Sequence, residues 1–423
     1  APNGYVHNGT KYDVELTYAG QNVSVTSTDI SVYNERQKVA VSLKKEMDED
    51  KTFNLGKNNE ISSVQFGVYA NEDIKASNGD IIPKDALITF ANCDNNGNLS
   101  FNCDLPVGFK WYAKEIATDA HYILSDTKYE FDTEYQGQDI KVIDIKINND
   151  KAIENNLIYG SVKGLKVDRE TQEVIAGATF GLFKSDTTEF AKDNAILTAV
   201  TDENGIFNFS NIPYGEYLIK EIKPADGYLD SEDVFTVIIK DNEQVVEITA
   251  INDKVPELKT KATVNGKKEV IAKGEITIKD TVEYKHLVPN TEYVIKGTLM
   301  DKSTGKPFKV KGKEITSTVK FVPDKADGKV EVTFTFDGSA IKKDTKLVVF
   351  ETLYRDGVEL TAHAGINDDG QTVTIKVPEL EIPKTGDERN KKALASVMSV
   401  SALGAVSIAY YLLKKKKNNK EEK

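Results

Sequence analysis

The sequence has 423 residues, 29% of them charged, and a net charge of −12 at pH 7. This length predicts about three domains, at roughly 100 to 200 residues each. An acidic chain without a basic stripe is atypical of nucleic-acid binding, which we do not expect here. Two cysteines are too few for a disulfide framework or a zinc site, and we expect neither a metal nor a cofactor.

The first segment, residues 1–34, repeats a phrase that occurs twice further along the chain. It opens as "APNGYVHNGTKYDVEL", which is similar to "ATDAHYILSDTKYEFD" from Ala117 and to "KPADGYLDSEDVFTV" from Lys223. A phrase that recurs inside the chain predicts that residues 1–34 are the C-terminal fragment of a preceding domain. The last strand of that domain would end at Asn34.

Residues 35–156 and 157–254 are two copies of one repeat. Both contain short alternating runs rich in Val, Ile, Phe and Tyr, separated by Asn-Gly or Pro-x-Gly turns. That pattern predicts an all-β sandwich for each copy. The acidic loops "DNNGN" and "DENG" are interpreted as hairpin turns and not calcium loops, because Gly97 stands at the fourth position from Asp94 and not at the sixth.

Each copy also places three polar residues in phase with its apolar core face. Val39, Val41 and Leu43 share parity with a lysine, for example, so the core face of that strand continues into Lys45. Burying unpaired polar or charged groups is costly, so each of these residues needs a partner. For one copy alone, snorkelling lysines and asparagines that cap strand ends would be the simpler explanation. The residues are Lys45, Glu115 and Asn155 in the first copy and Lys166, Glu221 and Asn252 in the second.

With the whole pattern repeated, the copies resemble SpaA-like domains, also called collagen-adhesin B-type domains, of Gram-positive pilins and adhesins. The stretch "YLIKEIKPADGY" is close to their glutamate-bearing box, and "LKVDRETQEVIAGATFGLF" is close to their opening strand pair. The resemblance implies Ig-like or prealbumin-like sandwiches that each carry an internal isopeptide bond. The bonds would join Lys45 to Asn155 with Glu115 assisting, and Lys166 to Asn252 with Glu221 assisting.

The first copy departs from this family pattern. There "KEIATDAHY" replaces the usual small-residue and Gly-Tyr turn, and Asn148 or Asn149 could compete with Asn155 as the acyl partner. Spacing favours Asn155, because it precedes the lysine of the next copy by the same interval that separates Asn34 from Lys45.

The proposed bond explains why these residue types are needed. An apolar core lowers the pKa of a lysine and raises that of a glutamate, which leaves a neutral amine beside a protonated acid. The amine attacks the asparagine carboxamide, the glutamate relays protons, and ammonia leaves. Each pair reacts once, so we expect self-modification and no enzyme. The bond would join the first and last strands of a sandwich and carry tension past the rest of it.

Residues 255–379 follow a different pattern. "LVPNTEYVIKG" imitates the glutamate box, but Gly297 stands where the glutamate would be. "PELKTKATVNGKKEV", "LVVFETLYRDG" and "AHAGINDDGQTV" resemble a Thr-Gln ester-bond domain, which is also a sandwich. The resemblance implies Thr260 as the nucleophile and Gln371 as the acyl partner, with Thr263 as the alternative nucleophile. A hydroxyl needs an adjacent base to attack an amide. The relay residues would be His363, Glu351 and Asp280.

The two cysteines, Cys93 and Cys103, flank the "DNNGN" turn. With the turn centred on Asn96 and Gly97, Cys93 would lie opposite a residue near Ser100 and not opposite Cys103. A disulfide and two separate core or edge cysteines both remain open.

Residues 380–423 combine three signals. The pentapeptide "IPKTG" precedes an uncharged run, residues 393–413, and a lysine-rich tail, residues 414–423. About twenty apolar or small residues at ~1.5 Å each span a bilayer core, and a buried helix fits the flanking charges less well. In this order the signals resemble a Gram-positive cell-wall sorting signal, in an Ile variant of Leu-Pro-x-Thr-Gly. The pentapeptide comprises Ile382, Pro383, Lys384, Thr385 and Gly386.

The sorting-signal resemblance implies that a sortase cleaves between Thr385 and Gly386, after a transient membrane insertion, and joins Thr385 to peptidoglycan. The elements together predict tandem all-β sandwiches followed by one C-terminal transmembrane helix. We expect a surface protein covalently anchored in the Gram-positive cell wall, whose cross-linked sandwiches form a stalk or adhesin segment. The alternatives are a pilus subunit joined through Thr385 to the next pilin, and an adhesin domain that binds a host matrix or cell-surface ligand.

Overall fold

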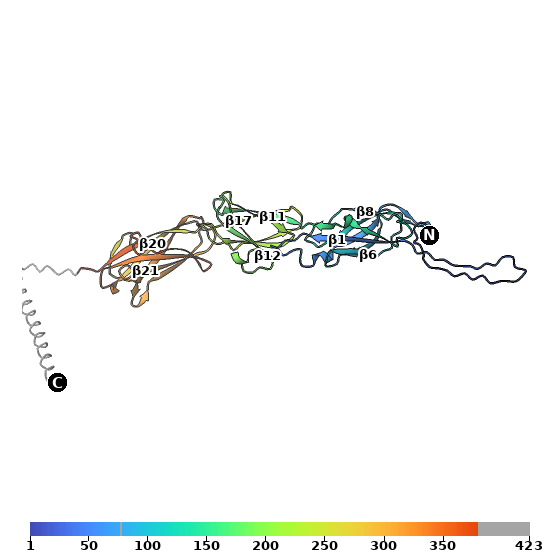
Figure 1. The fold of residues 1–423 in the computed structure, drawn as a ribbon. Helices are drawn as coiled ribbons and strands as arrows, with labels where there is room; N and C mark the ends of the chain where they lie inside the picture. Colours follow the sequence, from blue (N-terminus) through green and yellow to red (C-terminus); the bar gives the residue numbers. More distant parts are fainter. Residues whose placement is uncertain (77, 380–423) are drawn as a thin grey trace, which may run out of the picture. The chain divides into compact units, whose positions relative to one another are not determined.

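The computed structural model describes residues 1–76 and 78–379, which form two compact units. Unit 1 contains residues 1–257, 285–290 and 323–327, and unit 2 contains the other described residues from 258 onward. Unit 1 holds two β-sandwiches and unit 2 holds a third (Figure 1). The all-β prediction is confirmed, because helical structure in the described residues is limited to short 3-10 turns. They are η1 (Glu60–Ser63), η2 (Ile147–Asp150), η3 (Lys192–Asn194) and η4 (Gly338–Ala340).

The first sandwich contains strands β1 (Lys38–Met47), β2 (Gln65–Ala70), β3 (Ile74–Lys75), β4 (Ile81–Ile82), β5 (Leu87–Asn92), β6 (Asn98–Phe101), β7 (Lys110–Ala117), β8 (Tyr129–Asp132), β9 (Val142–Lys146) and β10 (Ala152–Asn155). One sheet has the order β10-β1-β6, with β9 also paired to β1, and the other has the order β5-β2-β7-β8. Alternation along β1 buries Val39, Val41, Leu43 and Lys45 and exposes Lys44, as its phase predicts.

The second sandwich contains β11 (Tyr159–Asp168), β12 (Thr179–Lys184), β13 (Leu197–Val200), β14 (Ile206–Pro213), β15 (Gly215–Lys223), β16 (Val234–Ile239) and β17 (Val245–Asn252). Its sheets have the orders β14-β11-β17 and β13-β12-β15-β16. As in the first sandwich, the opening strand lies beside the closing strand in parallel: β1 pairs with β10, and β11 pairs with β17. Each of these two sandwiches has its own apolar core.

The third sandwich contains β18 (Glu257–Thr263), β19 (Glu269–Ile271), β20 (Glu275–Lys285), β21 (Tyr293–Asp301), β22 (Lys306–Pro307), β23 (Lys309–Val310), β24 (Lys313–Glu314), β25 (Thr316–Phe321), β26 (Gly328–Asp337), β27 (Thr345–Arg355), β28 (Val358–His363) and β29 (Thr372–Lys376). One sheet has the order β18-β20-β26. The other has the order β19-β29-β27-β21-β22, with β25 paired to β21 and β28 to β27. The labelled strands β20 and β21 of Figure 1 belong to these two sheets.

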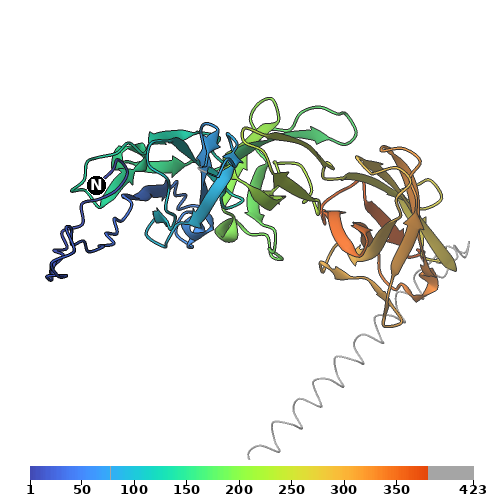
Figure 2. The same cartoon turned by 90° about the vertical axis from the view of Figure 1, so that its right-hand side faces the viewer.

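The segment from residue 8 to residue 34 contains no strand and runs as an extended excursion (Figures 1 and 2, dark blue). Its apolar side chains, such as Leu16, Tyr18 and Val25, are exposed. Its base contacts the first sandwich, where Val6 is buried and the N–H of His7 donates to the carbonyl of Gln138 at 2.8 Å. The assignment of residues 1–34 to a preceding domain stays a prediction.

The turn between β5 and β6 is tight, but the hairpin prediction is wrong, because these strands belong to different sheets; the second such turn, between β13 and β14, also joins two sheets. Asp94 Oδ1 accepts the N–H groups of Asn96 at 2.9 Å and Asn98 at 2.8 Å, so its carboxylate serves the turn. Cys93 is buried and Cys103 half-buried, and both are free thiols.

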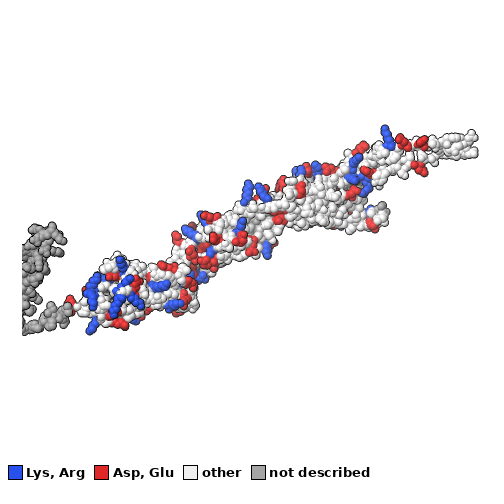
Figure 3. All heavy atoms as spheres, turned by 90° about the horizontal axis from the view of Figure 1, so that it is seen from below, with Lys and Arg blue, Asp and Glu red and all other residues white. Residues whose placement is uncertain are grey.

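Charged side chains of both signs are interspersed on the surface seen in Figure 3. Cross-strand pairs such as Lys279 with Glu331, at 2.8 Å, hold some of them. Exposed pairs of this kind contribute about 0–1 kcal/mol each, so the buried polar groups matter more to the fold. No helix in the described residues is both long and apolar enough to cross a bilayer. The pentapeptide 382–386, the uncharged run 393–413 and the basic tail all lie outside the described residues.

Candidate cross-linking sites

The second sandwich brings Lys166, Glu221 and Asn252 together in its core. Lys166 lies on β11 and Asn252 ends β17, while Glu221 lies on β15 in the opposite sheet. All three are buried, with Lys166 fully inaccessible. The Lys166 amine donates to Asn252 Oδ1 at 2.6 Å and lies 3.3 Å from a Glu221 oxygen. Asn252 Nδ2 donates to Glu221 Oε2 at 2.8 Å and to the Leu229 carbonyl at 3.1 Å, so amine, amide and acid contact one another.

A stacked pair of aromatic rings packs beside the Lys166 amine. The Phe180 ring is 5.5 Å from Nζ, and it stacks on Phe207 with ring centroids 3.9 Å apart. Phe207 fills the space beside Gly164, where a Cβ would fall 2.0 Å from its ring, which explains the glycine in the core-facing series of β11. Burial among these rings removes water from the amine and lowers the pKa of Lys166.

The first sandwich places Lys45, Glu115 and Asn155 at the corresponding positions on β1, β7 and the end of β10. Their exposed fractions are all 2% or less. Asn155 Nδ2 donates to Glu115 Oε1 at 2.7 Å, and Asn155 Oδ1 is buried without a hydrogen-bond partner. The Lys45 amine donates instead to the main-chain carbonyl of Ile153 at 2.9 Å. The amide therefore meets its acid as in the second sandwich, whereas the amine is held by the main chain.

Burial sets the protonation of the first site. It lowers the pKa of Lys45 to about 8, although the nearby Glu115 opposes this shift. Burial also raises the pKa of Glu115, against hydrogen bonds from the Ser125 N–H and from Asn155. A neutral amine beside a protonated carboxylic acid is therefore accessible near neutral pH.

Asn148 and Asn149, the competing asparagines, lie in η2 with left-handed backbone angles. Asn148 Nδ2 donates to main-chain carbonyls. Of the asparagines considered, Asn155 is the one whose amide meets Glu115.

Unit 2 gathers its five expected residues between its two sheets. Thr260 on β18 and Asp280 on β20 come from one sheet, and Glu351 on β27 and His363 on β28 come from the other, where Gln371 directly precedes β29. Thr260 Oγ1 and His363 Nδ1 are 3.3 Å apart. Gln371 Nε2 donates to Glu351 Oε2 at 2.8 Å, and Gln371 Oε1 is buried without a hydrogen-bond partner. Of the two threonines considered, the one at position 260 thus meets the histidine.

Two carboxyl groups, Asp280 and Glu351, are fully buried close to each other in this site. Burial raises the pKa of both. The adjacent Asp280 raises the pKa of Glu351 further, so Glu351 holds a proton at neutral pH. A protonated Glu351 in contact with the Gln371 amide can supply a proton to the nitrogen that leaves.

Asp368 is a further residue of this site, which the sequence did not indicate. Its Oδ2 lies 3.3 Å from His363 Nε2, and its Oδ1 accepts the N–H groups of Gly370 at 2.6 Å and Gln371 at 3.3 Å. It orients the imidazole whose other nitrogen faces Thr260, and it fixes the turn that carries the acyl partner. In sequence it is only one of the acids in a turn-forming stretch, and folding alone brings it to the histidine.

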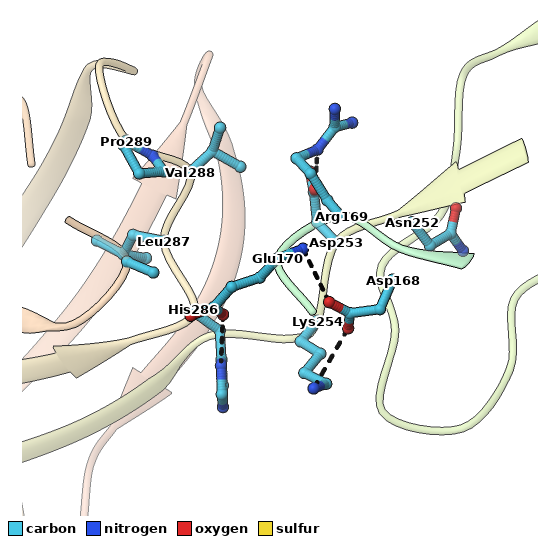
Figure 4. Close-up of a pocket in the computed structure, with 11 residues that line it drawn as sticks. Asp168, Arg169, Glu170, Asn252, Asp253, Lys254, His286, Leu287, Val288 and Pro289 are labelled. Atoms are coloured by element: carbon cyan, nitrogen blue, oxygen red, sulfur yellow. Dashed lines mark hydrogen bonds and ion pairs between the residues drawn. The ribbon is translucent and has the colours of Figure 1, made fainter. Parts of the chain in front are cut away.

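Asp168 lies at the end of the second site, in the hollow shown in Figure 4. It is buried, and its register partner on β17 is Asn252. Its Oδ1 accepts the N–H groups of Glu170 and Thr171, both at 2.8 Å, and its Oδ2 lies 3.3 Å from Lys254 Nζ. Although burial raises the pKa of Asp168, these partners outweigh it and lower the pKa overall. The ionised Asp168 thus fastens together the strand ends that carry the lysine and the asparagine.

Family models match two parts of the chain. Residues 160–254 match the SpaA prealbumin-like fold domain, and residues 256–375 match the T-Q ester bond containing domain. A collagen adhesin of Staphylococcus aureus is 31% identical over 140 residues. That alignment covers 33% of this chain and 12% of the adhesin's own length.

Several solved structures are also similar to this chain. The TIE protein of Bacillus anthracis has a TM-score of 0.39 and 17% identity over 84% of this chain and 53% of its own. BcpA, the major pilin subunit of Bacillus cereus, has a TM-score of 0.33 and 20% identity, over 52% of this chain and 69% of its own. A Mobiluncus mulieris adhesin containing intramolecular disulfide, isopeptide and ester bond cross-links has a TM-score of 0.27 and 20% identity, over 30% and 58%.

Proposed function

We propose that this chain is a load-bearing segment of a bacterial surface adhesin, in which each of three sandwiches forms an internal cross-link. The match of residues 160–254 to a prealbumin-like fold domain and of residues 256–375 to a T-Q ester bond containing domain supports this proposal. The observation that carries this proposal is the meeting of nucleophile, amide and acid in the second core. The Lys166 amine lies 2.6 Å from Asn252 Oδ1, out of contact with solvent. Burying a charged lysine is costly, and converting it to an amide removes the charge.

The two lysine sites follow one reaction. The neutral amine adds to the carboxamide carbon, and the buried acid passes a proton to the amide nitrogen and recovers one from the amine. A new C–N bond to lysine forms, the bond to the amide nitrogen breaks, and one ammonia leaves. The lysine and the asparagine are consumed, so the reaction is a single self-modification without turnover.

The third site forms an ester by the same logic. The Thr260 hydroxyl passes its proton to His363 as its oxygen adds to the amide carbon of Gln371. Glu351 protonates the departing nitrogen, an ester C–O bond replaces the C–N bond, and ammonia leaves.

Intact mass tests all three bonds at once. Each bond removes one ammonia, so the full chain should weigh about three times 17 Da less than its sequence. Lys45→Ala, Lys166→Ala and Thr260→Ala should each restore about 17 Da. The matched controls Lys44→Ala, Lys163→Ala and Thr263→Ala alter neighbours on the same strands and should leave the mass deficit unchanged. A wild-type chain at its full sequence mass would refute the proposal.

The same proposal places the chain at the Gram-positive cell surface, joined to peptidoglycan through Thr385 by a sortase. The order of pentapeptide, uncharged run and basic tail supports it, as does the similarity to part of a collagen adhesin. Incubation with a sortase and an oligoglycine amine should replace everything after Thr385 by the glycine peptide, and Thr385→Ala should prevent this. A ladder of covalent multimers in wall extracts would instead indicate a pilus subunit.

A further inference from the structure

Thr118 lies against the nitrogen that must leave the first cross-linking site. Asn155 Nδ2 donates to Thr118 Oγ1 at 2.9 Å and to Glu115 Oε1 at 2.7 Å. Both hydrogens of the amide are therefore committed, which fixes the carboxamide plane. Asn155 Oδ1 is left buried and unpartnered for the approach of the Lys45 amine.

The second site has a different group in this place. Asn252 Nδ2 donates there to the main-chain carbonyl of Leu229, at 3.1 Å. Pro224 stands three residues after the assisting Glu221, as Thr118 stands three residues after Glu115. The hydroxyl is therefore specific to the first copy, and it belongs to the "KEIATDAHY" stretch in which that copy departs from its family pattern.

The carboxamide of the first site also lacks a hydrogen bond that the second site has. In the second site the lysine donates directly to the amide oxygen, and this hydrogen bond helps to hold the carboxamide. In the first site Lys45 donates to the Ile153 carbonyl, so the carboxamide of Asn155 is held from its nitrogen side.

We propose that Thr118 is a catalytic residue of the first cross-link, which positions the Asn155 carboxamide and continues to accept a hydrogen bond from its nitrogen as that nitrogen is protonated and departs as ammonia. This inference rests on the proposed function. Before the reaction the amide nitrogen only donates, because its lone pair is delocalised into the carbonyl. After Lys45 adds to the carboxamide carbon, the same nitrogen becomes an amine with a free lone pair. Glu115 protonates this lone pair, so Thr118 stays the acceptor of an N–H from the departing group. The positive charge on that group strengthens the hydrogen bond in the transition state.

The step balances without any further reactant. Glu115 passes its proton to the departing nitrogen and takes up the proton that Lys45 loses as its nitrogen bonds to the carbon. The old C–N bond breaks and ammonia leaves, while Thr118 keeps its own proton throughout.

The test compares Thr118→Val, which removes the hydroxyl at nearly constant shape, with Thr118→Ser, which keeps it. The full chain is made by cell-free synthesis and sampled over time, and the two lysine cross-links are quantified as separate tryptic species by mass spectrometry. Thr118→Val should slow the first bond about tenfold, the loss expected for one hydrogen bond in the transition state. Thr118→Ser should restore most of the rate, and the exposed Thr127→Val should change nothing. The second bond of the same molecules serves as the internal standard.

A structural role would give a different result. If Thr118→Val merely loosened the packing around Lys45, the midpoint of the pH–rate profile for the first bond would move; we expect the rate to fall with the midpoint unchanged. Equal rates for wild type and Thr118→Val, equally slow rates for Val and Ser, or a shifted midpoint would each overturn the role of Thr118. A wild-type chain that forms neither lysine bond would instead overturn the proposed function itself.

Discussion

Replacing Asn155 by Ala should trap the first sandwich with an unreacted lysine in its core. Lys45 is 2% exposed, and burial lowers its pKa from 10.5 to about 8. That gap corresponds to about 3 kcal/mol of destabilisation in the folded state at neutral pH. A further change, Lys45→Met, removes this penalty but also deprives the Ile153 carbonyl of its hydrogen bond, at a cost of about 1 kcal/mol. The double variant should therefore be more stable than Asn155→Ala by about 2 kcal/mol at pH 7.

The pH dependence of this difference has a definite sign. Because the folded pKa of Lys45 is lower than the unfolded one, the unfolded chain binds more protons between pH 8 and 10.5. The penalty of the buried lysine is therefore complete below pH 8 and disappears as the pH rises through 10.5. The advantage of the methionine should be constant from pH 6 to 8, shrink above pH 8 and reverse near pH 10.5, where only the lost hydrogen bond remains.

Trp111 allows this measurement in the full chain. It is the single tryptophan of the sequence and is 1% exposed in the core of the first sandwich, so its fluorescence in urea reports the unfolding of that sandwich. The exposed Lys44→Met in the Asn155→Ala background is the control and should leave the urea midpoint unchanged at every pH. Equal midpoints for Asn155→Ala and its Lys45→Met derivative at pH 7, or a gap that persists at pH 10.5, would refute the burial argument.

Three further predictions concern the reactive groups. The first bond should form about fiftyfold faster at pH 8 than at pH 6. With a Lys45 pKa of about 8, the neutral fraction of the amine rises from about 1% to about 50% over this range. Time-resolved mass spectrometry measures the rate, and a rate that does not change with pH would contradict the prediction. His363→Ala should abolish ester formation, and Asp368→Asn should slow it by about 10²-fold. Ester formation is measured as the loss of about 17 Da, with the lysine bonds as internal standards. An unchanged rate of ester formation would show that neither residue takes part in the proton relay. The Cys93 thiol, whose pKa burial raises to about 11, should resist iodoacetamide at pH 8 longer than the half-buried Cys103, and equal labelling of their tryptic peptides would argue against this.

Strand phase was sufficient to place the lysines and the asparagines on the core faces of their sandwiches, although their pairing came from the family resemblance and the spacing. A period of two places Lys45 and Lys166 on the core faces of their strands, and the structure buries both there. The same argument locates Asn155 and Asn252, because a strand that ends in phase with its core leaves its last side chain inside. These positions depend only on local periodicity, which a sequence carries in full.

Strand phase could not predict which residues on turns would join the sites. Asp368 and Thr118 lie between strands, where no period fixes the direction of a side chain, and each acquires its partner only when distant segments meet. The sequence also did not show that the two lysine amines donate to different acceptors. It depends on whether Nζ meets an amide oxygen or a main-chain carbonyl in the folded core, and the two sequences are alike at that point.

The ester site differs from the lysine sites in the strands that it joins. Lys166 and Asn252 lie on parallel neighbours of one sheet, and a long side chain covers the offset between them. Thr260 lies on β18 in one sheet of unit 2, and Gln371 lies at the start of β29 in the other. A short hydroxyl side chain can bridge them only if the two main chains meet. They do so where the N–H of Ala262 donates to the Gly370 carbonyl at 3.0 Å. The acid pair is divided in the same way, with one carboxyl from each sheet. The proposed lysine bond would thus resist sliding of the first strand past the last within a sheet, whereas the proposed ester would resist separation of the two sheets.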